Sequence, residues 1–115
     1  MNRLDLQRLI HTLLECALTS ENCAASFLEK EFTEKTRLIE LTRDCAEICF
    51  QSAQLLQRKS EIALKYLTIT EEICRLCAEE CGKHEEIICQ KSAEICNECA
   101  EYCNESHLTL TKEEF

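Results

Sequence analysis

The chain has 115 residues, which suits one domain with a modest core, and it contains a single glycine and no proline. So few turn residues exclude an all-β fold, which needs many tight turns, and favour long helices with short connections. The formal net charge of −9 argues against a nucleic-acid partner, because such partners need a basic surface.

Apolar residues recur at three- and four-residue spacing along nearly the whole chain, which predicts four amphipathic helices. We place them at about residues 3–28, 34–58, 61–82 and 85–106, followed by a C-terminal tail at 107–115. All four keep a seven-residue repeat, as helices in antiparallel bundles do. The predicted fold is an all-α, antiparallel four-helix bundle with inward-facing cysteines, formed by residues 1–106.

The inward faces of the first two predicted helices carry apolar residues along one part of their length and cysteines along another. The inward face of the first reads Leu6, Leu9, Leu13, Cys16 and Cys23. The inward face of the second reads Leu38, Leu41, Cys45, Cys49, Ser52 and Leu56. Because each spacing returns to one side of a helix, the thiols and the apolar residues share the buried face.

The third and fourth predicted helices carry most of the cysteines. The third has Cys74, Cys77 and Cys81, and Gly82 is expected to end it in the left-handed conformation that glycine favours. The fourth has Cys89, Cys96, Cys99 and Cys103. The segment 72–81 is partly repeated as 94–103, which indicates one local arrangement used more than once.

Aligning the helices as an antiparallel bundle divides the predicted core in two. Cysteines gather at the end where the third helix turns into the fourth, and in the middle. The opposite end is expected to be hydrocarbon, formed by Leu6, Leu9, Ile10, Leu13, Leu55, Leu56, Ile62, Tyr66 and Leu67. This half could hold the fold together without a metal.

Eleven cysteines in so short a chain are the most unusual feature of the sequence. A secreted disulfide scaffold is the usual reading, but the count is odd and the N-terminal residues lack the apolar stretch of a signal peptide. We therefore expect a cytosolic protein with reduced thiols. Helical neighbours three or four residues apart hold their Cβ atoms about 5–6 Å apart, too far for a disulfide but suited to a bridging metal.

Soft thiolates select Cu(I), zinc or iron–sulfur clusters. Cu(I) fits an extended set of thiolates because it accepts two or three of them and each can bridge two ions. The candidate ligands are Cys16, Cys23, Cys45, Cys49, Cys74, Cys77, Cys81, Cys89, Cys96, Cys99 and Cys103, with His84 at the mouth of the bundle. A single zinc held by Cys74, Cys77, Cys96 and Cys99 is an alternative, because their spacing matches a zinc ribbon.

The pattern resembles the four-helix-bundle copper storage proteins. The segments that carry the resemblance are 44–49, with Cys45 and Cys49, then 74–84, and then Cys89 with 96–103. The resemblance implies a cytosolic bacterial bundle that stores Cu(I) along its core and associates as a homotetramer. This chain departs from the family pattern at Ser20, Phe27, Ser52 and Ser92, where cysteine is common in such proteins. Fewer thiols imply either a lower capacity or a family member that has moved from bulk storage toward chaperoning or sensing.

The sequence therefore predicts a non-enzymatic protein that sequesters Cu(I), with no nucleic-acid or membrane partner. No nucleophile–base pair or phosphate-binding loop is apparent in the sequence. A thiol oxidoreductase would need one reactive, partly exposed pair of cysteines, and the inward spacing argues against it. The remaining alternative is a disulfide-stapled or purely apolar bundle used for protein contacts.

Overall fold

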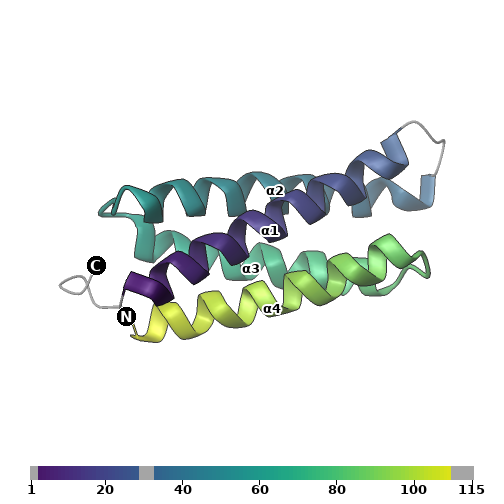
Figure 1. The fold of residues 1–115 in the computed structure, drawn as a ribbon. Helices are drawn as coiled ribbons and strands as arrows, with labels where there is room; N and C mark the ends of the chain where they lie inside the picture. Colours follow the sequence, from purple (N-terminus) through teal and green to yellow (C-terminus); the bar gives the residue numbers. More distant parts are fainter. Residues whose placement is uncertain (1–2, 29–32, 110–115) are drawn as a thin grey trace.

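The structure, a computed structural model, describes residues 3–28 and 33–109. The described chain forms four long helices and one short 3-10 turn: α1 (Arg3–Leu28), η1 (Thr33–Lys35), α2 (Thr36–Gln57), α3 (Ala63–Gly82) and α4 (Ile87–Thr109). Each successive helix runs back along the one before it (Figure 1). The predicted all-α, antiparallel four-helix bundle is confirmed.

The bundle is long and narrow, with principal extents of 49 × 19 × 19 Å. Helix α1 packs against α2 and α4, and α3 packs against the same two helices. The end of α1, the start of α2 and the turn between α3 and α4 lie together at one end, as the antiparallel alignment predicts (Figure 1). We call this the polar end, because Lys35, Glu80, His84 and Glu86 meet there.

Several helix boundaries differ from the predicted ones, because α2, α3 and α4 each begin two residues later than predicted. Helix α4 continues through Thr109, so the first three residues of the predicted tail are helical, while residues 110–115 lie outside the described chain. In this added part of the helix, Nδ1 of His107 lies 3.3 Å from the Leu64 carbonyl, which connects the end of α4 to α3. Gly82 is the last residue of α3 and lacks a positive φ, so it is not the left-handed terminator that we predicted.

The turn between α2 and α3 explains a further correction. Lys59 has a φ of 51°, and the Ser60 amide donates to the Leu55 carbonyl at 2.9 Å. Residues 61 and 62, predicted to begin the third helix, lie in this turn. Ile62 consequently projects outward with 55% of its surface exposed, so it does not belong to the hydrocarbon half of the core.

The remaining core is divided as predicted. Leu9, Leu13, Leu56 and Leu67 are fully buried. They belong to the first half of α1, the last turn of α2 and the first half of α3, and these parts of the helices lie away from the polar end (Figure 1). All eleven cysteines are buried as well. Hydrocarbon therefore fills one half of the interior and sulfur dominates the other.

Thr42 takes the buried position on α2 that we predicted for Leu41. Its side chain is fully buried, and its hydroxyl donates to the Leu38 carbonyl at 2.7 Å, whereas Leu41 is only half-buried. The helix thus tolerates a hydroxyl in its core because the preceding turn accepts the hydrogen bond.

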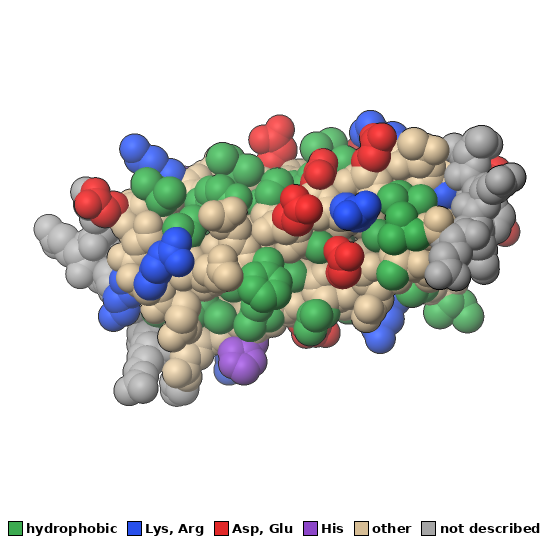
Figure 2. Space-filling view, turned by 90° about the horizontal axis from the view of Figure 1, so that it is seen from above, with side chains coloured by type: hydrophobic (Ala, Val, Ile, Leu, Met, Phe, Trp, Pro, Cys, Tyr) green, Lys and Arg blue, Asp and Glu red, His purple; other side chains and the backbone are tan. Residues whose placement is uncertain are grey.

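Charged and apolar side chains alternate over the surface, and several apolar groups lie open to solvent (Figure 2). The most exposed large ones include Leu18, Ile87 and Leu108. Within the described residues, none of the helices has the length and apolar character needed to cross a membrane.

Candidate metal centre

Each of the four long helices contributes thiols to the axis of the bundle. Cys16 and Cys23 come from α1, Cys45 and Cys49 from α2, three cysteines from α3 and four from α4. All eleven predicted thiols are buried and unbridged. The helical spacing read from the sequence therefore places the thiols correctly.

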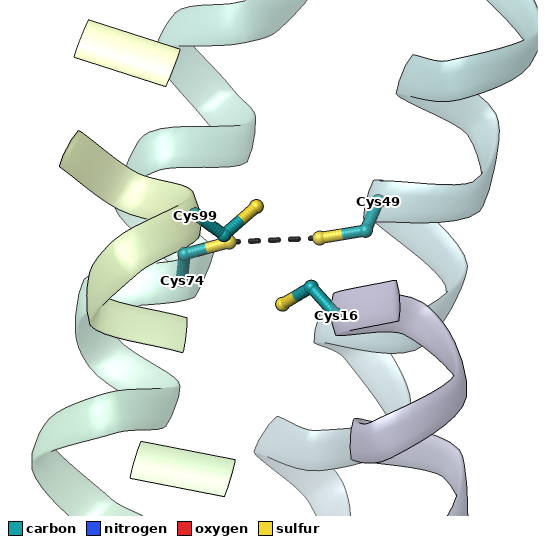
Figure 3. Close-up of side chains that lie close together, drawn as sticks. All are labelled: Cys16, Cys49, Cys74 and Cys99. Atoms are coloured by element: carbon teal, nitrogen blue, oxygen red, sulfur yellow. Dashed lines mark hydrogen bonds between the residues drawn. The ribbon is translucent and has the colours of Figure 1, made fainter. Parts of the chain in front are cut away.

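One thiol from every long helix meets near the middle of the molecule. The sulfur atoms of Cys16, Cys49, Cys74 and Cys99 all lie within 4.8 Å of one another. The side chains converge from opposite sides of the bundle, and the Sγ atoms of Cys49 and Cys74 are 3.5 Å apart (Figure 3). Four soft donors thus surround one small volume that is closed to solvent.

A second group of three thiols adjoins this one. The Sγ atoms of Cys16, Cys45 and Cys96 form a nearly equilateral triangle with sides of 3.9, 3.8 and 3.9 Å. An ion bound to three sulfurs at about 2.3 Å would hold them about 4.0 Å apart. The triangle therefore matches trigonal coordination with little movement of the side chains. Because Cys16 belongs to both groups, we treat them together as the inner thiol cluster: Cys16, Cys45, Cys49, Cys74, Cys96 and Cys99.

Three further thiols lie nearer the polar end. Cys23 interacts with Cys81 and with Cys89, and we call these three residues the outer thiol cluster. Cys77 is 3.9 Å from Cys81 between their Sγ atoms. Cys103 lies on the other side of the inner thiol cluster, within hydrogen-bonding range of Cys99.

The sulfur separations argue against disulfides within the described chain. Even the closely spaced Sγ atoms of Cys49 and Cys74 are 3.5 Å apart, whereas a disulfide bond is about 2.05 Å long. The disulfide-stapled alternative therefore finds no bonded pair among the eleven cysteines, all of which are free.

Hydrogen bonds among the thiols shift the pKa values of neighbouring cysteines in opposite directions. The bond with Cys16 lowers the pKa of Cys45, and the same contact raises the pKa of Cys16. Cys103 and Cys99 form a second such pair, in which the pKa of Cys99 is lowered and that of Cys103 is raised. A thiolate surrounded by S–H donors is stabilised despite its burial, so the cluster can present an anionic ligand to a cation.

In the outer thiol cluster, Cys81 is the thiol whose pKa is lowered. Hydrogen bonds with Cys23 and then with Cys77 lower the pKa of Cys81, and the nearby His84 acts in the same direction. The pKa of Cys23 is raised, first by its bond with Cys81 and then by burial. Each cluster therefore holds at least one thiol whose surroundings favour the thiolate.

His84 lies at the polar end with 12% of its side chain exposed, and both ring nitrogens are occupied. Lys35 donates from Nζ to Nδ1 of His84 at 2.7 Å, which leaves Nε2 to donate to Glu80 at 2.9 Å. Among the described residues, His84 belongs neither to the group of four converging thiols nor to the group of three. Coordination of a metal by His84 would require one of these two bonds to break.

Two buried charges at the polar end were not predicted. Lys35 is 4% exposed, lies 5.2 Å above the Phe27 ring and pairs with Glu86 at 2.9 Å. Glu80 is 7% exposed and pairs with His84 and Arg37. Charged groups this deeply buried are retained because each one has a partner of opposite charge or a hydrogen bond.

The spacing of residues along the sequence could have predicted that Lys35 is buried. The positions Lys35, Leu38, Thr42, Cys45, Cys49, Ser52 and Leu56 alternate by three and four residues, which is the inward stripe of α2. Extending that stripe backward from Leu38 would have placed Lys35 on the buried face. Glu80 pairs with Lys83 and His84, three and four residues further along the chain, and with Arg37 from α2.

The thiols proposed for a single zinc do not gather around one point. Cys74 and Cys99 belong to the group of four, Cys96 belongs to the group of three, and Cys77 belongs to neither. A zinc-ribbon site made from these residues alone is therefore not formed within the described chain. The departures from cysteine noted in the sequence are all inward: Ser20, Ser52 and Ser92 are fully buried, and Phe27 is 5% exposed.

Comparisons with known proteins agree with this geometry. The family model described as "Csp: Copper storage protein" matches residues 2–108. An uncharacterized cysteine-rich protein of Bacillus subtilis, YhjQ, is 32% identical over 85 residues, which cover 73% of this chain and 79% of that protein.

Solved structures are similar over almost the whole chain. The Cu(I)-bound copper storage protein BsCsp3 superposes with a TM-score of 0.83 at 29% identity, covering 88% of this chain and 96% of that one. A cytosolic copper storage protein from Streptomyces lividans, loaded with five coppers, gives a TM-score of 0.88 at 28% identity, covering 95% and 97%.

Proposed function

The chain belongs to the copper storage protein family, and from that premise we propose that it binds and stores Cu(I) on the thiolates of its core. The observation that carries the proposal is the convergence of buried thiols from all four helices, with sulfur separations of 3.5 to 4.0 Å. Cu(I) is the cargo, and the protein supplies soft ligands in a space from which water is excluded.

The proposed ligands are the eleven cysteines, with His84 as a further ligand at the polar end. The trigonal arrangement of Cys16, Cys45 and Cys96 suits one ion directly. Sulfurs shared between neighbouring groups would bridge ions, so the number of bound ions should approach the number of thiols and not exceed it. Each ion that binds displaces thiol protons, so uptake should weaken as the pH falls.

Sequestration requires no chemical conversion of the cargo, so we propose a binding protein and not an enzyme. The buried thiols lack the solvent access that a thiol oxidoreductase needs. The cytosol is the proposed location, because the thiols must stay reduced to bind Cu(I).

The proposed assembly is a homotetramer, as the family resemblance implies. Light scattering during size-exclusion chromatography should then give about four times the chain mass of 13.3 kDa. A mass equal to that of one chain would overturn the tetramer and leave copper binding unaffected.

Anaerobic titration tests the storage function. Fully reduced protein is mixed with Cu(I) in the presence of a chromogenic Cu(I) chelator, and the ions withdrawn from the chelator are counted. Storage predicts tight uptake of several equivalents per chain. Uptake of one equivalent or none, by protein with all eleven thiols titratable, would exclude it.

A quadruple variant distinguishes storage from the zinc alternative. Replacing Cys74, Cys77, Cys96 and Cys99 with serine removes every ligand of the zinc-ribbon set but leaves seven thiols. The variant should keep part of its Cu(I) capacity if the thiols form an extended set. Complete loss of metal binding would favour a single site. Circular dichroism of the variant provides the check that it remains helical.

A further inference from the structure

A layer of hydroxyl side chains lies between the outer and the inner thiol clusters. On α1, Ser20 follows Cys16 by four residues and precedes Cys23 by three. On α2, Thr42 precedes Cys45 by three. These spacings keep both hydroxyl residues on the inward face, and both are fully buried.

Helix α4 repeats the arrangement. Ser92 follows Cys89 of the outer thiol cluster by three residues and precedes Cys96 of the inner thiol cluster by four. Its side chain is fully buried and lies next to Cys23 of the outer thiol cluster. On three of the four helices, therefore, the inward position between the two clusters holds an alcohol.

Cys77 occupies the corresponding position on α3, three residues after Cys74 and four before Cys81. Its Sγ atom is 3.9 Å from that of Cys81 in the outer thiol cluster. On the other side it interacts with Cys45 and Cys96 of the inner thiol cluster, and these contacts raise its pKa. Among the described residues, Cys77 is thus the thiol in this layer that reaches both clusters.

We propose that Cys77 is the relay through which Cu(I) passes between the outer and the inner thiol clusters. The proposal rests on the storage function and adds a route to it. An alcohol is a hard, neutral ligand and binds Cu(I) poorly, so Ser20, Thr42 and Ser92 cannot serve as intermediate ligands for the ion. Without Cys77, an ion would have to leave one set of sulfurs before reaching the next.

The transfer is a pair of ligand exchanges in which copper stays Cu(I). An ion held by Cys81 forms a bond to the sulfur of Cys77 while its bond to Cys81 breaks. The proton of the Cys77 thiol moves to the Cys81 thiolate that copper leaves. A second exchange carries the ion from Cys77 to Cys96, and the Cys96 thiol returns its proton to Cys77. Charge and protons balance in both steps.

Rapid-mixing kinetics with two single variants test the relay. Cys77→Ser removes the relay, whereas the control Cys103→Ser removes one thiol beyond the inner thiol cluster. Uptake of Cu(I) by reduced protein is followed by the ultraviolet absorbance of copper–thiolate bonds. Both variants should lose a similar, small part of the capacity. Only Cys77→Ser should slow the later phase, by about tenfold or more, which corresponds to about 1.4 kcal/mol of added barrier.

Restoring a thiol elsewhere in the layer provides the stricter test. The double variant Cys77→Ser/Ser92→Cys places a sulfur between Cys89 and Cys96, so the later phase should recover. Equal time courses for Cys77→Ser and Cys103→Ser, or no recovery in the double variant while circular dichroism shows the native helix content, would overturn the relay. If the unmodified chain takes up at most one Cu(I), the storage function fails instead.

Discussion

At the scale of single residues, a buried hydroxyl group without a hydrogen-bond partner lowers the free energy of unfolding. The Ser52 hydroxyl is fully buried and has no hydrogen-bond partner in the described chain. The Ser20 hydroxyl is equally buried, but it lies 3.8 Å from the sulfur of Cys96. A buried polar group that is left unpaired costs about 1–3 kcal/mol, whereas a paired one contributes to stability.

The two serines should therefore respond differently to removal of the hydroxyl. Ser52→Ala should raise the free energy of unfolding of the reduced, metal-free protein by about 1 kcal/mol. Ser20→Ala, the matched control, should lower it slightly. Urea unfolding followed by circular dichroism measures both. A loss of stability in Ser52→Ala equal to that in Ser20→Ala would mean that the Ser52 hydroxyl is paired.

At the scale of the element, α1 has a leucine-lined half whose packing should decide the stability of the metal-free bundle. Leu13 is fully buried, whereas Leu18 on the same helix is 62% exposed. Leu13→Ala should destabilise the metal-free protein by about 2–5 kcal/mol, because it leaves a cavity in the buried core. Leu18→Ala should change stability by less than about 0.5 kcal/mol.

Thermal unfolding of both leucine variants provides the measurement. Their Cu(I) capacities should match that of the unmodified chain, provided that titration is done well below the unfolding temperature, because neither substitution removes a thiol. A fall in capacity for folded Leu13→Ala would contradict the division of the core into two independent halves.

The end of α3 should respond to pH through Glu80. Burial alone would raise the pKa of Glu80, but the hydrogen bond from His84 and the charges of Lys83 and Arg37 hold it below its usual value. The stabilisation is therefore complete above the unfolded pKa of about 4.3 and is lost as the pH falls through the lower folded pKa.

Glu80→Gln should consequently lower the melting temperature of the metal-free protein at pH 7, and the difference from the unmodified chain should shrink as the pH approaches 3. Glu79→Gln, at an exposed neighbouring position, provides the control and should have little effect at either pH. An undiminished difference at low pH would show that Glu80 stabilises the helix end by packing alone.

At the scale of the whole molecule, folding and metal binding should be separable. The leucine-lined half offers a packed core that contains no ligand, unlike the small zinc domains that are unfolded without their metal. The metal-free, reduced protein should therefore show the same helix content as the copper-loaded protein. Its melting temperature should rise on loading, because Cu(I) binds the folded state. A disordered metal-free chain in circular dichroism would contradict this expectation.

Spacing along the chain predicted the fold and the inward thiols because both depend on a repeat within single helices. The four-helix bundle, the buried cysteines and the leucine-lined half all follow from that repeat. Ile62 was misplaced because its exposure depends on where the turn after α2 ends, which the repeat does not determine.

The contacts at the polar end could not be predicted from residue spacing, for a different reason. Lys35 meets Glu86 and His84 across separations of 51 and 49 residues, so their pairing depends on how two hairpins dock. Likewise, the grouping of Cys16 with Cys45 and Cys96 reflects the register between helices, which fixes which thiols converge. Sequence spacing identified the ligands but not their partition into clusters.

The leucine-lined half also bears on the lifetime of the empty chain. Proteases in a cell attack the open forms of a protein, so degradation follows the fraction of molecules that are unfolded. A bundle closed by its own hydrocarbon contacts keeps that fraction low whether copper is scarce or plentiful. The abundance of this protein should therefore be set by its synthesis, and a cell would keep a standing stock of vacant chains ahead of any surge in copper supply.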